Sequence, residues 1–303
     1  MKKSYTAHGK TILIGEHAVV YGSPALALPI KGLTITTTVT DAPRDFELAT
    51  ARYHGPFFTA PSEFDGLKYI VRTMKARAYR REPLRISYEG EIPMQRGLGS
   101  SAVVAFGTTQ VLNQYYHLHL SFDDIMDVTN HAESITHGKA SGLDAATVAS
   151  NDLVFFTAKT GVEKIKQKLG ATLLIMDTGK MGQTKKAVTQ VHELYKEEVA
   201  VRQAIHQLGL LANNFKKAWL QADSTNCGDL FNHAQALLAQ LQVSTDTIDE
   251  LCRLANQQGA LGAKLSGGGL GGIVIALCTD SVTAEKIAFA AKDLIAHYWV
   301  EEI

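Results

Sequence analysis

Residues 5–40 carry apolar positions that alternate or run together and many β-branched side chains, which is the pattern of strands. Gly15, Gly22 and Pro24 interrupt this pattern and predict turns. Further strand patterns cover 85–93, 152–158 and 171–179, and the C-terminal YWVEEI predicts a short last strand. The stretch AKLSGGGLGGIVIALC, residues 263–278, predicts a strand, a glycine loop and a second strand.

Helical spacing of apolar residues marks most of the remaining chain. Ser121 is the expected N-cap of one such helix, with Asp123 and Asp124 in its first turn, where the helix dipole favours anions. The predicted helices cover 65–79, 100–116, 122–137, 183–206, 209–221, 228–241, 246–258 and 281–297.

The order of these elements indicates the fold class. The first half of the chain is rich in strands and the second in helices, and the strands are grouped rather than alternating regularly with helices. This arrangement favours an α+β fold over a doubly wound sheet. A chain of 303 residues is long enough for two domains. Because the polar segment TAKTGVEKIKQKLG separates two predicted strands, we expect domains at 1–168 and 169–303.

Charge and cysteine content exclude several classes of function. The 30 Lys and Arg balance the 30 Asp and Glu, so no net field favours a nucleic acid or an acidic membrane as partner. The N-terminal segment SYTAHGKTIL is too polar for a signal peptide, and the longest apolar run, IVIALC, is too short to span a bilayer. Cys227, Cys252 and Cys278 form no CxxC pair and fit buried positions in a reducing compartment. We therefore expect a cytoplasmic protein.

The stretch RGLGSSAVVAFG, residues 96–107, places very flexible residues directly before a predicted helix. Its glycines let the backbone adopt a positive φ and approach a ligand closely. The helix start adds unpaired N–H groups and a partial positive charge. Although the spacing fits neither a Walker A loop nor GxGxxG, these features together predict a phosphate-binding loop. The loop comprises Arg96, Gly97, Leu98, Gly99, Ser100 and Ser101. The alternative is a serine-capped helix with glycines for tight packing.

Two further stretches combine glycine or polar residues with apolar surroundings. KLSGGGLGG, residues 264–272, has five glycines in nine residues, which predicts either a second backbone nest for phosphate or a long hairpin turn. GKTILIGEHAVVYG, residues 9–22, contains Lys10, Glu16 and His17 within an apolar pattern. Each of these three residues taken alone fits an ordinary core or surface position.

Glu133 and Asp144 supply the carboxylates that a phosphoryl-transfer site needs. Mg²⁺ prefers hard oxygen ligands, so Glu133 together with the Ser101 hydroxyl suits this ion. Asp144 beside Lys10 suits an acceptor hydroxyl, because an adjacent ammonium keeps the carboxylate ionised. A solvated helix face for Glu133 and a helix N-cap for Asp144 are the alternatives, since spacing does not show that these groups converge.

These stretches together resemble the GHMP kinase superfamily, named for galactokinase, homoserine kinase, mevalonate kinase and phosphomevalonate kinase. Its three motifs occur in order, as GKTILIGEHAVVYG, PMQRGLGSSA and KLSGGGLGG, and the resemblance covers nearly the full chain. GEHAVVYG and HGKASGLD are most similar to the mevalonate kinase patterns. The resemblance implies two domains, a left-handed β-α-β unit and an active site in the cleft between the domains. It also implies phosphorylation of the 5-hydroxyl of mevalonate by Mg-ATP, a step of isoprenoid biosynthesis, and a homodimer.

The resemblance implies roles for individual residues. Lys10 and Asp144 match the catalytic pair, and Ser101 and Glu133 match the Mg²⁺ ligands. The residues assigned to the substrate are Glu16, His17, Thr184, Gly267 and Gly268. Three positions depart from the residues usual in the superfamily without removing a catalytic group: Arg96 replaces a small residue, Ala140 replaces Pro, and Leu270 replaces Gly or Ala.

Other functions stay open at this point. Phosphomevalonate kinase or another small-alcohol kinase would use the same motifs, and Lys185 and Lys186 are candidates for the second anion site that a phosphorylated acceptor requires. The presence of Lys10, Glu133 and Asp144 argues against a non-catalytic regulatory relative. GEHAVVYG is a poor fit to a diphosphomevalonate decarboxylase.

Overall fold

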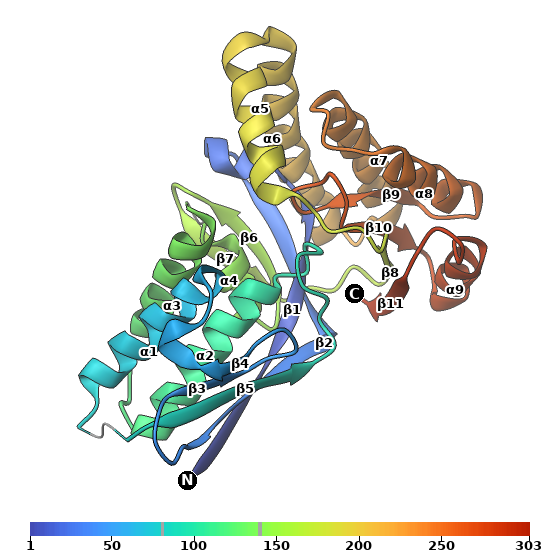
Figure 1. The fold of residues 1–303 in the computed structure, drawn as a ribbon. Coiled ribbons are helices and arrows are strands. Elements are labelled where there is room, and N and C mark those ends of the chain that lie inside the picture. Colours follow the sequence, from blue (N-terminus) through green and yellow to red (C-terminus); the bar gives the residue numbers. More distant parts are fainter. Residues whose placement is uncertain (80–81, 139–140) are drawn as a thin grey trace. The chain divides into compact units, whose positions relative to one another are not determined.

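The computed structural model describes residues 1–79, 82–138 and 141–303 (Figure 1). Ala140, the residue that replaces Pro, lies outside the described residues. The contacts define two compact units, of which the first comprises 1–9, 33–92 and 99–151, and the second comprises 10–32, 93–98 and 152–303. These units interleave along the chain because three segments contribute to both. They are the strand at 2–14, the strand at 25–41 and the central glycine loop, residues 96–101. The single domain boundary between 168 and 169 stays a prediction.

Seven strands form the larger sheet. Their order is β4-β3-β5-β2-β6-β7, and β1 pairs with β2. β2 pairs antiparallel with β6 through Ala25–Ala27 and with β5 through Ile35–Asp41. The strands are β1 (Lys2–Ile14), β2 (Ala25–Asp41), β3 (Glu47–Ala49), β4 (His54–Pro56), β5 (Leu84–Gly90), β6 (Leu153–Thr157) and β7 (Gly161–Ile165).

Three helices of the first unit bury an apolar core against strands β2, β3 and β5 (Figure 1). They are α1 (Asp65–Arg77), α2 (Ser100–Tyr116) and α3 (Phe122–His137), and the short α4 (Leu143–Val148) follows. The Ser121 cap of α3 is confirmed: its hydroxyl accepts from the Asp124 N–H at 3.1 Å, and the Asp124 carboxylate accepts in return from the Ser121 N–H. This capping box fixes the first residue of α3, the helix that carries Glu133.

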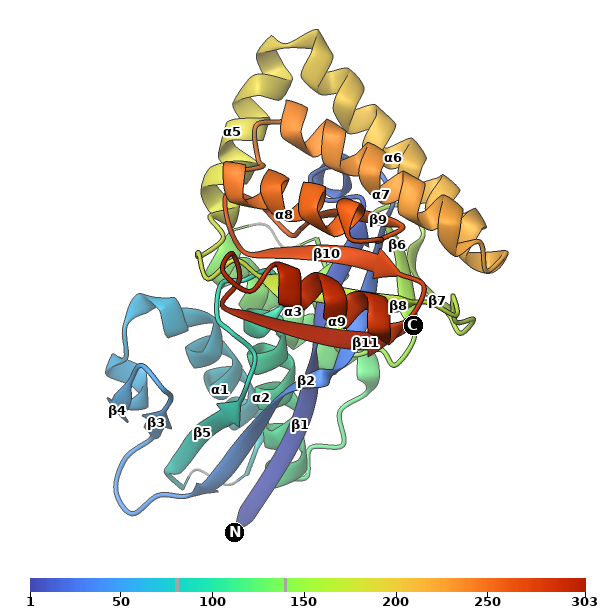
Figure 2. The ribbon, with the colours of Figure 1, turned by 90° about the vertical axis from the view of Figure 1, so that its right-hand side faces the viewer.

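A four-stranded antiparallel sheet of order β11-β8-β10-β9 forms the centre of the second unit. Its strands are β8 (Thr172–Asp177), β9 (Gly262–Ser266), β10 (Ile273–Cys278) and β11 (His297–Glu302). The helices of this unit are α5 (Thr184–Glu197), α6 (Val199–Leu220), α7 (Ser224–Gln240), α8 (Asp246–Gln257) and α9 (Ser281–Ala290). α7, α8 and α9 cover the sheet in Figure 2, and β8, β9 and β10 are buried throughout.

Two of the predicted helix boundaries are wrong. The break expected near Gly209 occurs at Glu198, where the backbone is extended, and α6 continues through Gly209. The missing side chain at Gly209 serves close packing instead, because a Cβ there would lie 2.6 Å from the Ser23 hydroxyl. α9 ends at Ala290 rather than 297. The short strands β3, β4 and β7 and the helix α4 carry too few apolar positions for their periodicity to predict them.

The α+β fold class is confirmed. All three cysteines are free and buried, as the sequence predicts. Across 1–79, 82–138 and 141–303, no helix has the length and apolarity needed to cross a membrane.

Candidate active site

The central glycine loop leads into α2 with its backbone N–H groups uncapped. Gly99 stands at the N-cap with φ 73° and has no side chain to accept from the first turn. Gly97 has φ 93°, and a Cβ at this position would lie 3.0 Å from the Ser266 carbonyl oxygen. Glycine at both positions therefore has a conformational reason. The start of α2 offers unpaired donors and a partial positive charge, which suits an anion such as phosphate.

Ser101 and Glu133 come together within the first unit. The Ser101 hydroxyl donates to Oε1 of Glu133 at 2.6 Å, and only 5% of Glu133 is exposed. The other carboxylate oxygen lies 3.9 Å from Nε2 of His137, one turn further along α3. The predicted pairing of a hydroxyl with a carboxylate is thus present as two adjacent hard oxygen donors.

Asp144 lies in the first turn of α4, also in the first unit. Gly142 begins this turn with φ 86°, and the Ser141 hydroxyl accepts from the Leu143 N–H at 3.3 Å. Lys10 belongs to the second unit, where it is 98% buried on β1 and donates its backbone N–H to the Leu98 carbonyl at 3.1 Å. The pairing of Lys10 with Asp144 stays a prediction.

The side chain of Arg96 interacts with the chain itself. Its Nη2 donates to the Gly179 carbonyl at 2.8 Å, and its Nε lies 3.3 Å from Oδ1 of the buried Asp177. Nε and Nη1 are buried without a hydrogen-bond partner. Arg96 therefore ties the central loop to the end of β8, and its predicted contact with phosphate stays a prediction.

Glu16 forms a buried ion pair with Lys264, a residue that the sequence reasoning did not single out. Burial raises the pKa of Glu16 and lowers the pKa of Lys264, while the charge of each partner opposes these shifts. Glu16 is only 1% exposed and one of its carboxylate oxygens faces the Lys264 ammonium. Direct contact of Glu16 with a substrate stays a prediction.

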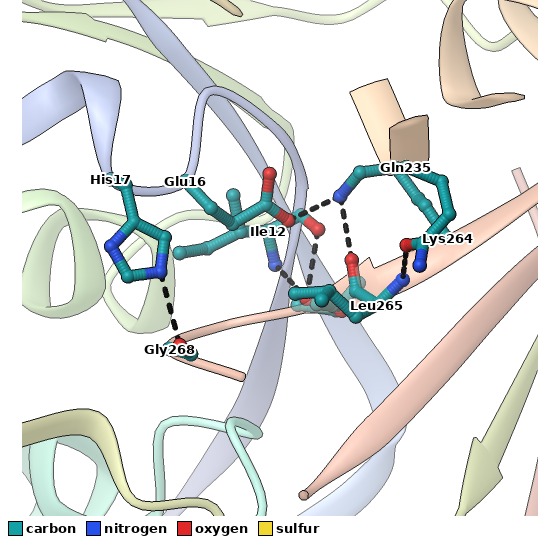
Figure 3. A network of polar contacts seen from close by, with 9 residues as sticks. Ile12, Glu16, His17, Gln235, Lys264, Leu265 and Gly268 are labelled. Atoms are coloured by element: carbon teal, nitrogen blue, oxygen red, sulfur yellow. Dashed lines mark hydrogen bonds and ion pairs between the residues drawn. The ribbon is translucent and has the colours of Figure 1, made fainter. Parts of the chain in front are cut away.

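His17 points its ring toward the third glycine loop, residues 267–272, which contains Gly268 (Figure 3). Its Nε2 lies 3.0 Å from the Gly268 carbonyl oxygen, which can only accept, so Nε2 carries the proton. Burial lowers the pKa of His17 to about 4, which leaves the ring neutral near pH 7. Nδ1 is then an acceptor, and among the described residues it is buried without a hydrogen-bond partner. A ligand hydroxyl is the kind of donor that this nitrogen lacks.

The third glycine loop, residues 267–272, packs closely against neighbouring backbone. A Cβ on Gly268 would lie 2.7 Å from the Cα of Thr184, the first residue of α5, and one on Gly272 would lie 2.8 Å from the Arg96 carbonyl oxygen. Leu270, which departs from the superfamily pattern, adopts a φ of 55° and donates to the Val243 carbonyl at 2.8 Å. The second unit thus brings Arg96 and Thr184 together with the loop, and their assignment to a common site stays a prediction.

Comparisons with known proteins agree with these motifs. The family model "GHMP kinases N terminal domain" matches residues 67–151, and "GHMP kinases C terminal" matches 201–296. The chain is 32% identical to a mevalonate kinase of Aeropyrum pernix, over 90% of this chain and 87% of that protein. It is 31% identical to a mevalonate kinase of Methanothermobacter thermautotrophicus, over 97% of this chain and all of that one.

A solved structure shows the same fold at lower identity. The Methanococcus jannaschii mevalonate kinase superposes with a TM-score of 0.85, at 22% identity, and covers 100% of this chain and 99% of its own. Two relatives above 30% identity span nearly the whole chain. The chain therefore belongs to the mevalonate kinase family of the GHMP kinases.

Proposed function

We propose that the chain transfers the γ-phosphoryl group of ATP to the 5-hydroxyl of mevalonate, giving 5-phosphomevalonate and ADP. One observation supports phosphoryl transfer most directly: the uncapped start of α2 lies beside the Ser101–Glu133 oxygen pair. The acceptor is supported by the two mevalonate kinases that match almost the whole chain.

The loop from Arg96 to Ser101 binds the phosphates of ATP in this proposal. Gly97 and Gly99 remove the side chains that would keep the backbone away from a phosphate. The first N–H groups of α2 then donate to phosphate oxygens, with the helix dipole adding to the attraction. Lys10 holds the loop at Leu98 through its backbone N–H.

The residues of the first unit fit a Mg²⁺ ion bound together with ATP. Ser101 and Glu133 would hold it, since both present hard oxygen atoms and Mg²⁺ often takes only one or two protein ligands. When bound, Mg²⁺ neutralises the charge of the transferring phosphoryl group.

Asp144 and Lys10 act on the acceptor. Asp144 accepts the hydrogen bond of the 5-hydroxyl and orients its oxygen for attack on the γ-phosphorus. The hydroxyl proton then passes to the Asp144 carboxylate as the new O–P bond forms, and the bond between the γ-phosphorus and the bridging oxygen breaks to release ADP. Because the transition state is loose, correct positioning of the hydroxyl matters more for the rate than the strength of the base. The buried Lys10 ammonium supplies positive charge where negative charge develops.

The mevalonate side is formed by Glu16, His17, Thr184, Gly267 and Gly268. The unpartnered Nδ1 of His17 accepts a hydrogen bond from a substrate hydroxyl, and Thr184 contributes a hydroxyl from the start of α5. Gly267 and Gly268 let the loop approach Gly97 and Thr184 closely, because neither carries a side chain. Glu16 directly precedes His17, and its carboxylate faces Lys264. We also propose that the chain functions as a homodimer.

The alternative acceptor is phosphomevalonate, which needs a second anion site. Lys185 and Lys186 lie in the first turn of α5 and are exposed, so they are the residues from which such a site would be built. Initial rates of ADP release with Mg-ATP and mevalonate, phosphomevalonate, galactose or homoserine separate the candidates. We expect turnover with mevalonate alone. Turnover with phosphomevalonate and not mevalonate would overturn the proposed acceptor while leaving the kinase chemistry intact.

A further inference from the structure

Lys264 is a charged residue in the third glycine motif, KLSGGGLGG, and the proposed function assigns it no contact with a substrate. Its side chain is fully buried on β9. The ammonium pairs with Glu16, donates to the Leu265 carbonyl at 2.7 Å and lies 5.7 Å from the centre of the Phe231 ring. These partners enclose the charge within the protein, so Lys264 does not serve as a free cation for phosphate.

The ion pair joins two segments that are far apart in the sequence. Glu16 lies in the turn after β1, and Lys264 lies on the strand that leads into the loop 267–272. Ser266, two residues after Lys264, makes a second connection: its hydroxyl accepts from the Ile12 N–H at 3.1 Å and donates to the Ile12 carbonyl at 2.8 Å. On the other side of β9, Gln235 accepts from the Leu265 N–H at 2.9 Å. Lys264 and Ser266 thus tie β9 to the end of β1 and to the turn that follows it.

His17, next to Glu16, has an unfavourable backbone conformation. Its φ is 59° and its ψ is −43°, a combination that a side chain with a Cβ rarely adopts. Such a conformation persists only where its surroundings determine it. Here Glu16 is anchored on one side of the residue, and the His17 ring is bound to the Gly268 carbonyl on the other. Both anchors lie on the segment formed by β9 and the loop that follows.

We propose that Lys264 is a positioning residue which, through Glu16, holds His17 in this conformation with Nδ1 presented as an unpaired acceptor. The ion pair also fixes the spacing between His17 and Gly268, because both of its ends lead into that contact within a few residues. The inference rests on the proposed function only in that the hydroxyl that donates a hydrogen bond to Nδ1 of His17 is taken to belong to mevalonate. A buried ion pair is a suitable device for such a task, since it gives specificity of arrangement rather than stability.

The main test is the double variant Glu16→Gln/Lys264→Met. Removing one charge alone would leave the other buried and unpaired, whereas removing both with residues of similar shape leaves folding close to normal. Glu16→Gln provides a second variant that keeps an acceptor for Lys264. Ile287→Val is the matched control, because Ile287 is fully buried in the same unit and lies on α9, which packs on β8, β10 and β11.

The first readout does not depend on activity. Histidine-selective nitrogen labelling and NMR report the protonation state of each ring, and comparison with His17→Gln identifies the His17 signals among the 11 histidines. We expect wild type and Ile287→Val to show one neutral tautomer protonated at Nε2. The double variant is expected to show a mixture of tautomers and a His17 pKa closer to 6.5.

The second readout is the split between KM and kcat. Loss of one hydrogen bond to substrate raises the KM for mevalonate about tenfold, with little change in the KM for ATP. Wild-type NMR signals and kinetic constants in the double variant would overturn the inference, and so would failure of both variants to fold, since the pair would then serve stability alone. Absence of mevalonate turnover in wild type would instead refute the proposed function, and the NMR result would stand apart from it.

Discussion

Acidification is expected to destabilise the folded chain through His17. Burial lowers the pKa of this side chain from 6.5 to about 4, the nearby ammonium of Lys264 adds to the effect, and the hydrogen bond to Gly268 opposes it. The unfolded chain therefore takes up a proton near pH 6.5, whereas the folded chain takes it up only near pH 4. The stability that this group contributes is complete above the higher value and is lost as the pH falls toward the lower one.

The size of the effect follows from the two pKa values. A group whose pKa falls from 6.5 to about 4 on folding contributes about 3 kcal/mol, lost at about 1.4 kcal/mol for each unit of pH. This is a large part of the stability of an ordinary domain. His17 is only 5% exposed, so solvent screening reduces this contribution little.

Urea unfolding followed by circular dichroism measures the effect between about pH 8 and pH 4.5. The reference is His17→Gln, whose amide still donates to the Gly268 carbonyl but does not titrate. We expect the free energy of unfolding of the wild type to fall relative to the variant by about 2.5 kcal/mol across this range, because the range extends about two pH units below 6.5. Parallel curves for the two proteins would refute the reasoning, because they would mean that His17 has the same pKa in both states.

Three further predictions concern the proposed site. Asp144→Asn should lower kcat by about a hundredfold or more while leaving thermal unfolding unchanged, and near-wild-type turnover would remove Asp144 from the reaction. Glu133→Gln should raise the Mg²⁺ concentration needed for half the maximal rate by about tenfold, and an unchanged Mg²⁺ dependence would contradict its role as a ligand. Gly268→Ala places a Cβ 2.7 Å from the Cα of Thr184 and should lower kcat/KM about tenfold or more, whereas Gly32→Ala, with its nearest contact at 3.9 Å, should not. Equal kinetics for these two variants would show that the approach of the loop to α5 is unimportant.

The sequence predicts those parts of the structure whose chemistry is local. The Ser121 N-cap and the start of α2 at Ser100 follow from residue types at fixed offsets along the chain. The helix break predicted near Gly209 is wrong because the role of this glycine depends on a contact that is distant in the sequence. Whether a glycine ends a helix or admits a neighbour depends on what packs there, and Ser23 lies nearly 190 residues away in the sequence.

The partners of the site residues were harder to predict. Lys264 lies within a quoted motif, yet a lysine in a strand usually extends to solvent, and only the complete burial of β9 shows that it cannot. The burial of Lys264 could have been predicted from the neighbouring β10. This strand is apolar on both faces, which indicates a central strand of a sheet that is covered on both sides. The ion pair of Arg96 with Asp177 likewise depends on tertiary contacts that the motif RGLGSS does not contain.

Phosphorus NMR of the reaction product tests the central claim most directly. The purified chain is incubated with Mg-ATP and mevalonate, and the product spectrum is recorded with proton coupling. The account predicts equal amounts of ADP and a new phosphomonoester whose signal is a triplet, because the 5-oxygen is attached to a methylene group. A phosphomonoester without this splitting would place the phosphate on the tertiary 3-hydroxyl. ADP formation without a phosphomonoester, or no ADP at all, would contradict the assignment of mevalonate as the acceptor.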